Sequence, residues 1–301
     1  MDMVKLASGI ELAVWDSGPK DAPALIFLHG FPESHRSWRH QIAHFEGHCR
    51  CIAPDQRGYG QSSKPRAVKA YATEKLIADV FELASALGVE KFTVVGHDWG
   101  GVIAWSVALM DMWVNKGALR VTRAIIANAP HPVRFQKLLW LDPAQRQASQ
   151  YIRAFRDPAN DALVSEHGLG ALLAKVVKWE RSPVLEPEER DAQLADWQDR
   201  DAAFGMLNWY RASVLNVPAM DAPFALPEDW REPSLPPIAI PALVIWAMED
   251  KALLPANLDG LDRMVPDLAI VRIPDCGHFV QWEKPAQVNA AIEAFLGRTR
   301  S

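Results

Sequence analysis

The residues with the clearest chemical potential form the pentapeptide Gly-His-Asp-Trp-Gly at residues 96–100. It has the Gly-x-nucleophile-x-Gly form and lies between an apolar run that predicts a strand and another that predicts a helix. The two glycines allow a turn too sharp for β-carbons, and such a turn lifts the central side chain above the end of a sheet. The central residue is Asp98, so the motif predicts a carboxylate nucleophile.

A carboxylate nucleophile restricts the class of reaction. Attack on a carbonyl carbon would give an anhydride, which is of little use for hydrolysing an ester. Attack on a saturated carbon displaces a leaving group and gives an alkyl ester of the enzyme. A second step must hydrolyse that ester with an activated water, and it requires a general base and an oxyanion hole. The alternative interpretation of residues 96–100 is an ordinary tight turn that carries an aspartate.

The predicted general base is His278, because the histidine comes last in the chain order nucleophile, acid, histidine. It is the only one of the nine histidines beyond residue 167. The acid is expected after the preceding strand, where Asp250 is favoured and Glu249 is the alternative. It would fix the histidine tautomer and stabilise the imidazolium form. The other possible place for the acid is the end of the strand that reaches Ile126, but it offers Asn128, which cannot be ionised, so we do not expect the acid there.

Two backbone N–H groups are expected to form the oxyanion hole. Trp99, the residue after the nucleophile, supplies one of them. The second is expected in the loop after residues 24–28, where Phe31 is the best donor because Pro32 has no N–H. A simple strand-ending turn is the alternative for this loop. Phe31 and Trp99 are also predicted to bind substrate, and His131 is a further candidate.

Alternating strands and helices must position these residues. Strand–helix alternation implies a mostly parallel sheet covered by helices on both faces, which is an α/β fold. The first helix is expected from about Thr73 to Gly88, another begins near Val102, and the last begins at Pro285. Apolar runs predict strands at residues 10–15, 24–28, 51–54, 92–95, 124–127, 243–246 and 269–273.

The strand pattern stops in the middle of the chain and resumes beyond a proline-dense joint. In between, the sequence predicts helical stretches separated by prolines, including residues 171–179 and 187–197. The sequence therefore predicts a helical cap inserted into a core. The expected segments are a first core part at residues 1–132, the cap at 133–235 and a second core part at 236–301.

Composition excludes several classes of protein. The 301 residues carry a net charge of −5, with 49% hydrophobic and 23% charged residues, which is typical of a globular protein with a substantial core. No lysine or arginine run is present, which argues against nucleic-acid binding. No segment approaches about 18 uninterrupted apolar residues, so we expect no membrane span, and residues 1–10 do not resemble a signal peptide.

The cysteines and the candidate metal ligands are also informative. Cys49, Cys51 and Cys276 are an odd set without a repeating spacing, so we expect reduced thiols in a cytoplasmic protein. No cluster of side chains has a recognisable metal-ligand spacing, so we expect neither a metal nor another cofactor.

Five segments in the expected order resemble the α/β-hydrolase superfamily and, within it, the epoxide hydrolases. The resemblance implies two cap tyrosines that donate hydrogen bonds to the epoxide oxygen. The segment around Tyr210 is very similar to one of the family's tyrosine segments, and that around Tyr151 is similar to the other. A phenol, with a pKa near 10, can donate a hydrogen bond and then a proton at neutral pH. The five matching segments are residues 29–32, 55–62, 96–101, 249–250 and 276–278.

The nucleophile segment is shared with haloalkane dehalogenases, which are the alternative. A halide leaves without a proton and is held by N–H donors. The resemblance to haloalkane dehalogenases implies an Asn or Trp donor where this chain has Phe31. Fluoroacetate dehalogenases would carry an Arg after the nucleophile, to bind the substrate carboxylate, where this chain has Trp99. Both departures favour an epoxide. A dehalogenase stays open because the cap tryptophans offer indole N–H groups. They are Trp140, Trp179, Trp197, Trp209 and Trp230.

Together these residues predict a hydrolase acting on ether bonds. Asp98 would attack an epoxide carbon, Tyr151 and Tyr210 would protonate the oxygen, and water activated by His278 and Asp250 would release a vicinal diol. The expected partners are a small epoxide and water, with no nucleic acid and no membrane, in a monomer or homodimer. A further alternative is a non-catalytic hydrolase-fold protein that binds a small hydrophobic ligand.

Overall fold

The computed structural model describes residues 1–114, 119–177 and 185–298, and its centre is an eight-stranded sheet. The strands lie in the order β1-β2-β4-β3-β5-β6-β7-β8. The six strands from β4 to β8 pair in parallel, whereas β1 and β2 are antiparallel to their neighbours. This confirms the predicted mostly parallel sheet. The strands are β1 Asp2–Lys5, β2 Glu11–Ser17, β3 Ala24–Leu28, β4 Arg50–Pro54, β5 Phe92–His97, β6 Val121–Ala127, β7 Ala242–Ala247 and β8 Leu268–Ile273.

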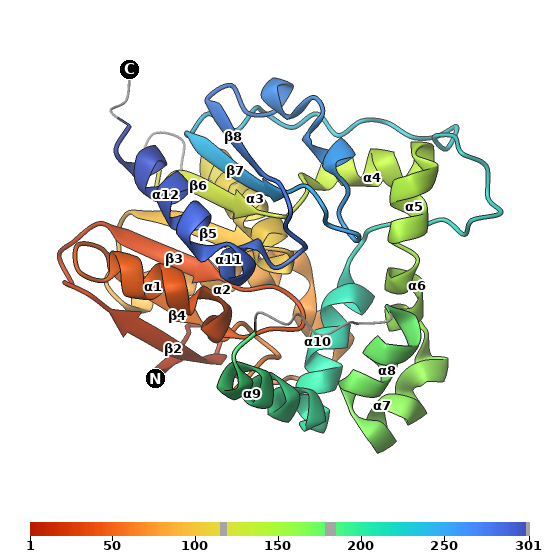
Figure 1. Cartoon of the computed structure of the whole chain (residues 1–301), viewed down its shortest axis with the longest axis horizontal. Coiled ribbons are helices and arrows are strands. Elements are labelled where there is room, and N and C mark those ends of the chain that lie inside the picture. Colours follow the sequence, from red (N-terminus) through yellow and green to blue (C-terminus); the bar gives the residue numbers. More distant parts are fainter. Residues whose placement is uncertain (115–118, 178–184, 299–301) are drawn as a thin grey trace.

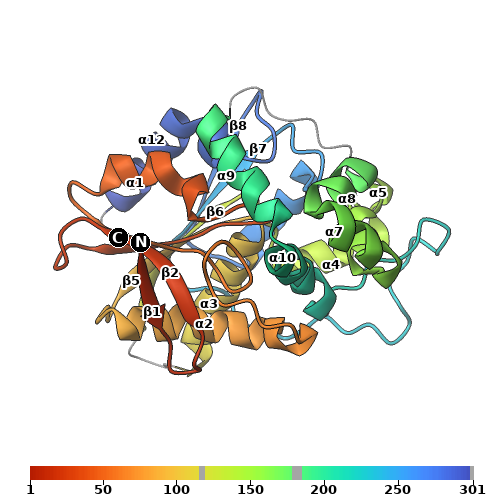
Figure 2. The same cartoon turned by 90° about the horizontal axis from the view of Figure 1, so that it is seen from below.

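Helices cover both faces of the sheet (Figures 1 and 2). Successive side chains of a strand point to opposite faces, so β3 places Leu25 and Phe27 in one buried cluster and Ile26 and Leu28 in the other. Strands buried on both faces consist of continuous apolar runs, and such runs predicted these strands from the sequence. One face packs on α1 (Arg39–Phe45), α11 (Val280–Glu283) and α12 (Pro285–Leu296), and the other on α2 (Thr73–Ala86) and α3 (Trp99–Val114).

A helical segment connects β6 to β7 and lies to one side of the sheet (Figure 1). The helix expected at residues 187–197 is α9, and the one expected at 171–179 corresponds to α8, although residues 178 and 179 lie outside the described part. After α10 the chain runs from Ser213 to Pro241 without a helix or strand. The helices are α4 Pro132–Leu141, α5 Pro143–Ala148, α6 Tyr151–Arg156, α7 Asp161–His167, α8 Leu169–Val176, α9 Pro187–Gln198 and α10 Arg200–Ala212.

The edge strand β1 was not predicted. Its four residues are exposed or half-buried, so it lacks the apolar run by which a buried strand is recognised. It pairs only with β2, at the edge of the sheet.

Two further expectations concern membranes and cysteines. None of the described helices is long and apolar enough to cross a bilayer. Cys49, Cys51 and Cys276 are all buried free thiols, and burial raises the pKa of Cys51 and of Cys276 to about 12. The predicted reduced state of the three cysteines agrees with this arrangement.

Candidate active site

Asp98 stands on a sharp turn between the end of β5 and the start of α3. Its backbone φ is +49°, in the left-handed region that non-glycine residues seldom adopt. A β-carbon on Gly96 would collide with the Gly100 backbone, and one on Gly100 would collide with the carbonyl of Leu28. The two glycines are therefore required for close packing, as the motif predicted. A strained residue at the end of a parallel strand marks a candidate functional position.

Three side chains predicted to act together meet near the carboxyl ends of the parallel strands. Asp250 follows β7, and His278 lies in the loop between β8 and α11. His278 Nδ1 is 2.6 Å from Asp250 Oδ2, and His278 Nε2 is 3.6 Å from Asp98 Oδ2. The imidazole thus lies between two carboxylates, with its Nδ1–H donated to Asp250. This geometry suits a histidine that takes a proton at Nε2.

The mutual charges of this cluster shift the pKa of each member. Burial alone would raise the pKa of Asp98, but the hydrogen bond and charge of His278 hold it below its ordinary value. Burial would lower the pKa of His278, yet Asp250 and then Asp98 raise it well above the usual value. The pKa of Asp250 is lowered, because His278 outweighs the effect of burial. At neutral pH both carboxyl groups are therefore ionised, as a nucleophile must be.

The structure distinguishes between the two candidate acids. Asp250 is buried, whereas Glu249 is exposed to solvent. Asp250 Oδ1 accepts hydrogen bonds from the N–H groups of Ala252 and Leu253, at 2.8 and 3.0 Å. These bonds fix the carboxylate so that its other oxygen faces His278. Geometry therefore favours Asp250 as the partner of the histidine.

Asn128 does not take the place of the acid, in line with the expectation, but it contacts the acid directly. Its Nδ2 donates to Asp250 Oδ2 at 2.8 Å, and its Oδ1 accepts from the Ala247 N–H at 2.8 Å. Its φ is +38°, so its backbone is strained like that of Asp98. The expectation considered only whether Asn128 could carry the charge. An amide at the end of the neighbouring strand can instead donate a hydrogen bond to the charged group. The sequence could have indicated this contact, because Asn128 and Asp250 each follow a predicted strand and the ends of neighbouring parallel strands lie close together.

The backbone around Asp98 provides the expected donors. The Phe31 N–H donates to Asp98 Oδ1 at 2.8 Å. Trp99 is the first residue of α3, where backbone N–H groups have no acceptor within the helix. Gly30 is needed beside them, since a β-carbon there would lie 2.8 Å from Asp98 Oδ1. Oδ1 thus faces the Phe31 N–H, while Oδ2 faces His278.

A cavity of about 420 Å³ opens over Asp98 between the sheet and the helical segment. Aliphatic and aromatic side chains dominate its wall, and Asp98 is the only carboxylate among the lining residues. Phe31 and His131, which the sequence suggested as substrate contacts, do not line it. The Phe31 ring packs edge-on against Tyr210, with centroids 5.0 Å apart, and His131 packs against Trp105. The residues that line it include Asp98, Trp99, Tyr151, Tyr210, Ser213, Leu215 and Trp230.

The two tyrosines of the helical segment, Tyr151 and Tyr210, face this cavity. Tyr151 begins α6 and Tyr210 lies in the last turn of α10, with ring centroids 6.2 Å apart. Burial raises the pKa of each phenol well above its ordinary value, and the charge of Asp98 adds to this. The Trp99 ring packs edge-on against Tyr210 at 5.2 Å. Both phenols are therefore protonated at neutral pH and can donate toward a group bound over Asp98.

The cap tryptophans have different roles in the structure. The Trp197 indole donates to the Pro32 carbonyl at 2.8 Å, and the Trp209 indole donates to the Arg57 carbonyl at 2.9 Å. These two N–H groups therefore join the helical segment to the core and do not serve the cavity. Trp140 packs against Trp230, which lines the cavity. Trp179 lies outside the described residues. Two of the five tryptophans that could donate to a halide are therefore bound to core carbonyls.

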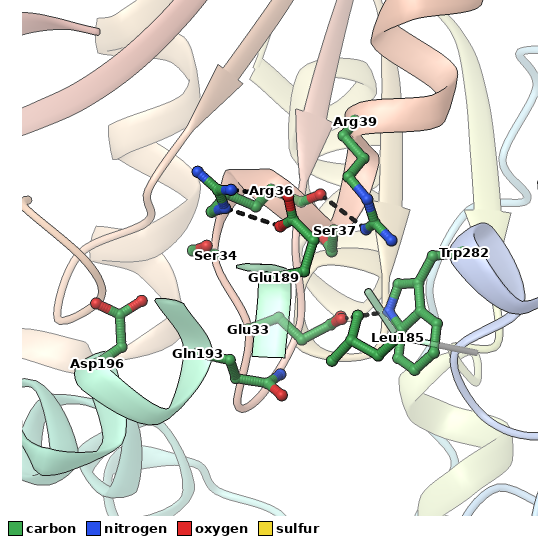
Figure 3. A pocket seen from close by; sticks show the side chains of 10 residues that line it. All are labelled: Glu33, Ser34, Arg36, Ser37, Arg39, Leu185, Glu189, Gln193, Asp196 and Trp282. Atoms are coloured by element: carbon green, nitrogen blue, oxygen red, sulfur yellow. Dashed lines mark hydrogen bonds and ion pairs between the residues drawn. The ribbon is translucent and has the colours of Figure 1, made fainter. Parts of the chain in front are cut away.

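A second cavity, of about 20 Å³, lies between η1 (His35–Trp38) and α9 (Figure 3). Arg36 donates two hydrogen bonds to Glu189 across it, at 2.8 and 2.7 Å. The Trp282 indole donates to Glu33 at 2.7 Å on the core side. The space suits about one water molecule, and Arg36 and Glu189 pair across it, so it is part of the contact between α9 and the core. Elsewhere in the described ranges, no three His, Cys, Asp or Glu side chains group as metal ligands.

Comparison with known proteins agrees with this geometry. The family model described as the alpha/beta hydrolase fold matches residues 23–285. A solved structure, titled as novel epoxide hydrolases in metagenomes from hot environments, is 63% identical, with a TM-score of 0.95 over 99% of this chain and 98% of that one. An inhibitor complex of Bacillus megaterium epoxide hydrolase is 28% identical, with a TM-score of 0.83 over 99% and 100% of the two chains.

A curated relative extends the comparison. Epoxide hydrolase A of Mycobacterium tuberculosis is 30% identical over 96% of this chain and 95% of its own length. The chain therefore belongs to the α/β-hydrolase family and, within it, to the epoxide hydrolases.

Proposed function

We propose that the protein converts an epoxide to a vicinal diol through a covalent ester on Asp98. One observation carries the proposal: an ionised Asp98 and two protonated phenols, Tyr151 and Tyr210, line the same largely apolar cavity. An epoxide needs a nucleophile at carbon and a proton donor at oxygen, on opposite sides of the ring. The core supplies the first and the helical segment supplies the second.

In the first step, Asp98 Oδ2 attacks an epoxide carbon and the carbon–oxygen bond breaks. Tyr151 and Tyr210 donate hydrogen bonds to the leaving oxygen, and one of them transfers its proton. The product is a hydroxyalkyl ester of Asp98 and one tyrosinate. Oδ1 becomes the ester carbonyl oxygen, and it already faces the Phe31 N–H.

In the second step, His278 Nε2 takes a proton from a water that attacks the ester carbonyl. The Phe31 and Trp99 N–H groups stabilise the oxyanion on Oδ1, and Asp250 stabilises the imidazolium. Collapse of the tetrahedral intermediate releases the diol and the Asp98 carboxylate. The proton on His278 then replaces the one that the tyrosine gave, so atoms and charge balance.

An isotope experiment tests the covalent step. In a single turnover in heavy-oxygen water, the first diol should contain no label, because its new oxygen comes from Asp98. Label in that first diol would overturn the ester mechanism. As a second measurement, His278→Gln with styrene oxide should accumulate an adduct whose mass equals enzyme plus epoxide. If haloalkanes release halide while epoxides stay intact, the substrate class is wrong.

The proposal extends to domain organisation. Residues 133–235 would form the cap over a core made of residues 1–132 and 236–301. Support comes from the position of both tyrosines in this segment and from the hydrogen bonds that Trp197 and Trp209 make to core carbonyls. A cap of this kind closes the site from bulk water during the reaction.

The working unit in this proposal is a single chain, as a monomer or as one half of a homodimer. Every group in the two steps comes from one chain, so catalysis does not need a residue from a partner. We place the protein in the cytoplasm, and its buried free thiols support this. Its partners are the epoxide and water. Neither step requires a metal or another cofactor.

A further inference from the structure

Two arginines join the helices that carry the two tyrosines. Arg156, the last residue of α6, donates from Nε to the Tyr210 carbonyl at 2.8 Å. Arg211, the residue after Tyr210 in α10, donates from Nε to the Phe155 carbonyl at 3.3 Å. Each arginine therefore binds the backbone of the other helix. These two hydrogen bonds connect α6 and α10 in both directions, next to the two tyrosines.

The chemistry of helix ends explains these contacts. The last carbonyls of a helix have no donor within the helix, and Tyr210 and Phe155 each lie within the last turn. A guanidinium near a helix C-terminus satisfies such carbonyls and interacts favourably with the helix dipole. Arg156 thus completes the end of α10 from a separate helix. Tyr210 is held at its own carbonyl oxygen.

Arg156 also binds the chain that follows α10. Its Nη2 donates to the Ser213 carbonyl at 3.2 Å, and its Nη1 donates to the Leu215 carbonyl at 2.6 Å. Tyr210, Ser213 and Leu215 all line the cavity over Asp98, whereas Arg156 does not. One half-buried cation therefore fixes three wall residues through their backbones without placing its charge in the cavity.

Packing transmits the position of α6 to both phenols. Phe155, next to Arg156, packs against Tyr151 and Tyr210 with ring centroids 5.4 and 5.0 Å away. It also contacts Phe31, whose N–H donates to the nucleophile. A shift of α6 against α10 would therefore move both phenols relative to Asp98.

We propose that Arg156 is a positioning residue for ring opening, which sets the spacing of Tyr151 and Tyr210 by holding the end of α10 against α6. The inference rests on the proposed function, since it assumes that these phenols serve the epoxide oxygen. It concerns the first step, because Tyr151 and Tyr210 act there, whereas Asp250 and His278 lie in core loops after β7 and β8. A displacement of about 1 Å can slow a reaction by about a hundredfold.

Arg156→Met tests this in single turnover with styrene oxide, by measuring adduct formation and adduct decay separately. We expect adduct formation to slow about tenfold or more and adduct decay to stay within about twofold of the parent. Arg153→Met is the matched control: Arg153 lies on the same helix and donates to the Val217 carbonyl, which does not line the cavity. It should leave both rates unchanged. Arg156→Lys keeps the charge with fewer donors, and it should give an intermediate rate.

The double variant Arg156→Met/Tyr210→Phe identifies the route of the effect. If Arg156 acts through Tyr210, its replacement should slow adduct formation by less than about twofold once the phenol hydroxyl is gone. A full additional loss in that background, or equal slowing of both steps, would overturn the positioning role. If Tyr210→Phe itself leaves adduct formation unchanged, the tyrosine step of the proposed function is wrong and the inference fails with it. If only Arg156→Met and Arg156→Lys have no effect, the inference alone is wrong.

Discussion

The two halves of the candidate site are built differently. The core half, with Asp98, Asp250 and His278, lies in the turns and loops that follow strands. Short hydrogen bonds already join His278 to Asp250 and the Phe31 N–H to Asp98. The cap half, with Tyr151 and Tyr210, stands on helices and is held by ring packing and by arginines on backbone carbonyls. The core half therefore has its partners before substrate arrives. The phenols of the cap half face the cavity over Asp98, where the epoxide oxygen would bind.

The largest expected effect comes from the nucleophile. Asp98→Asn keeps the shape of the side chain but removes the carboxylate that attacks the epoxide. We expect turnover to fall by about 10⁴-fold or more, as when the key member of a catalytic unit is removed. Steady-state diol formation measures this loss, and intact mass should show no adduct. An adduct in this variant would assign the nucleophile to another residue.

The next effect belongs to the cap half. Tyr210→Phe and Tyr151→Phe each remove one proton donor, and adduct formation should slow by about a hundredfold or more in each variant. Adduct decay should change far less, because His278 and its partners are untouched. Rapid-quench measurement of both steps separates the halves. Full epoxide activity in both variants would remove the main reason for preferring an epoxide over a haloalkane.

The same contrast explains how far the sequence alone could lead. Asp98, Asp250 and His278 each follow an apolar strand, and the ends of parallel strands meet at one edge, so their proximity was predictable. No such rule places Tyr151 and Tyr210, which lie on helices. Only the resemblance of their segments to the epoxide hydrolases predicted that they belong to the site. The positions of the tyrosine side chains relative to Asp98 depend on tertiary packing, which the sequence pattern does not show.

Phe31 and Asn128 show where sequence reasoning fails. The backbone N–H of Phe31 was expected near the nucleophile and lies there, but its ring turns into an aromatic cluster away from the cavity wall. The pairing of Asn128 with Asp250 joins residues 122 positions apart. Neither side-chain direction is encoded in a local pattern. Both depend on which side chains fill the neighbouring space.

The pH dependence of His278 should show how the core half is coupled. Its pKa is raised mainly by Asp250 and further by Asp98, so Asp98→Asn should lower it and Asp250→Asn should lower it more. The ester also removes the charge of Asp98, which makes His278 a better-populated neutral base for the second step. NMR titration of the imidazole measures these values. An unchanged pKa in both variants would contradict the proposed charge coupling.

The sign of the matching stability effect follows from linkage. The folded-state pKa of His278 lies above its unfolded value, so its charge stabilises the fold fully below about pH 6.5. That contribution is lost as the pH rises through the folded-state pKa. Asp98→Asn removes one of the charges that raise the pKa of His278, so the free energy of unfolding should fall less in this variant than in the parent as the pH rises into the alkaline range. Urea unfolding across that range, against the parent protein, measures the difference.

A smaller effect is expected at Asn128. Asn128→Ala removes one donor from Asp250 and leaves the Ala247 N–H without its acceptor. A hydrogen bond to a charged group contributes about 1.5–3 kcal/mol, so adduct decay should slow by about tenfold or somewhat more. Adduct formation should change little, since Asn128 does not touch the nucleophile's attacking oxygen. Equal slowing of both steps would mean that the variant disturbs the strand ends generally.

The smallest effect should come from the contact that joins the two halves. Trp197→Phe keeps an aromatic ring on α9 but removes the N–H that donates to the Pro32 carbonyl, next to the oxyanion donor Phe31. We expect a loss of about 1 kcal/mol in the free energy of unfolding, which is the usual size for one hydrogen bond. Urea unfolding gives this value, and Trp209→Phe, which loses the bond to Arg57, is the comparison. Because the Pro32 contact adjoins the oxyanion donor, we expect Trp197→Phe, but not Trp209→Phe, to slow adduct decay slightly. If Trp209→Phe slows adduct decay more than Trp197→Phe does, the contact that matters for the second step is the one at Arg57.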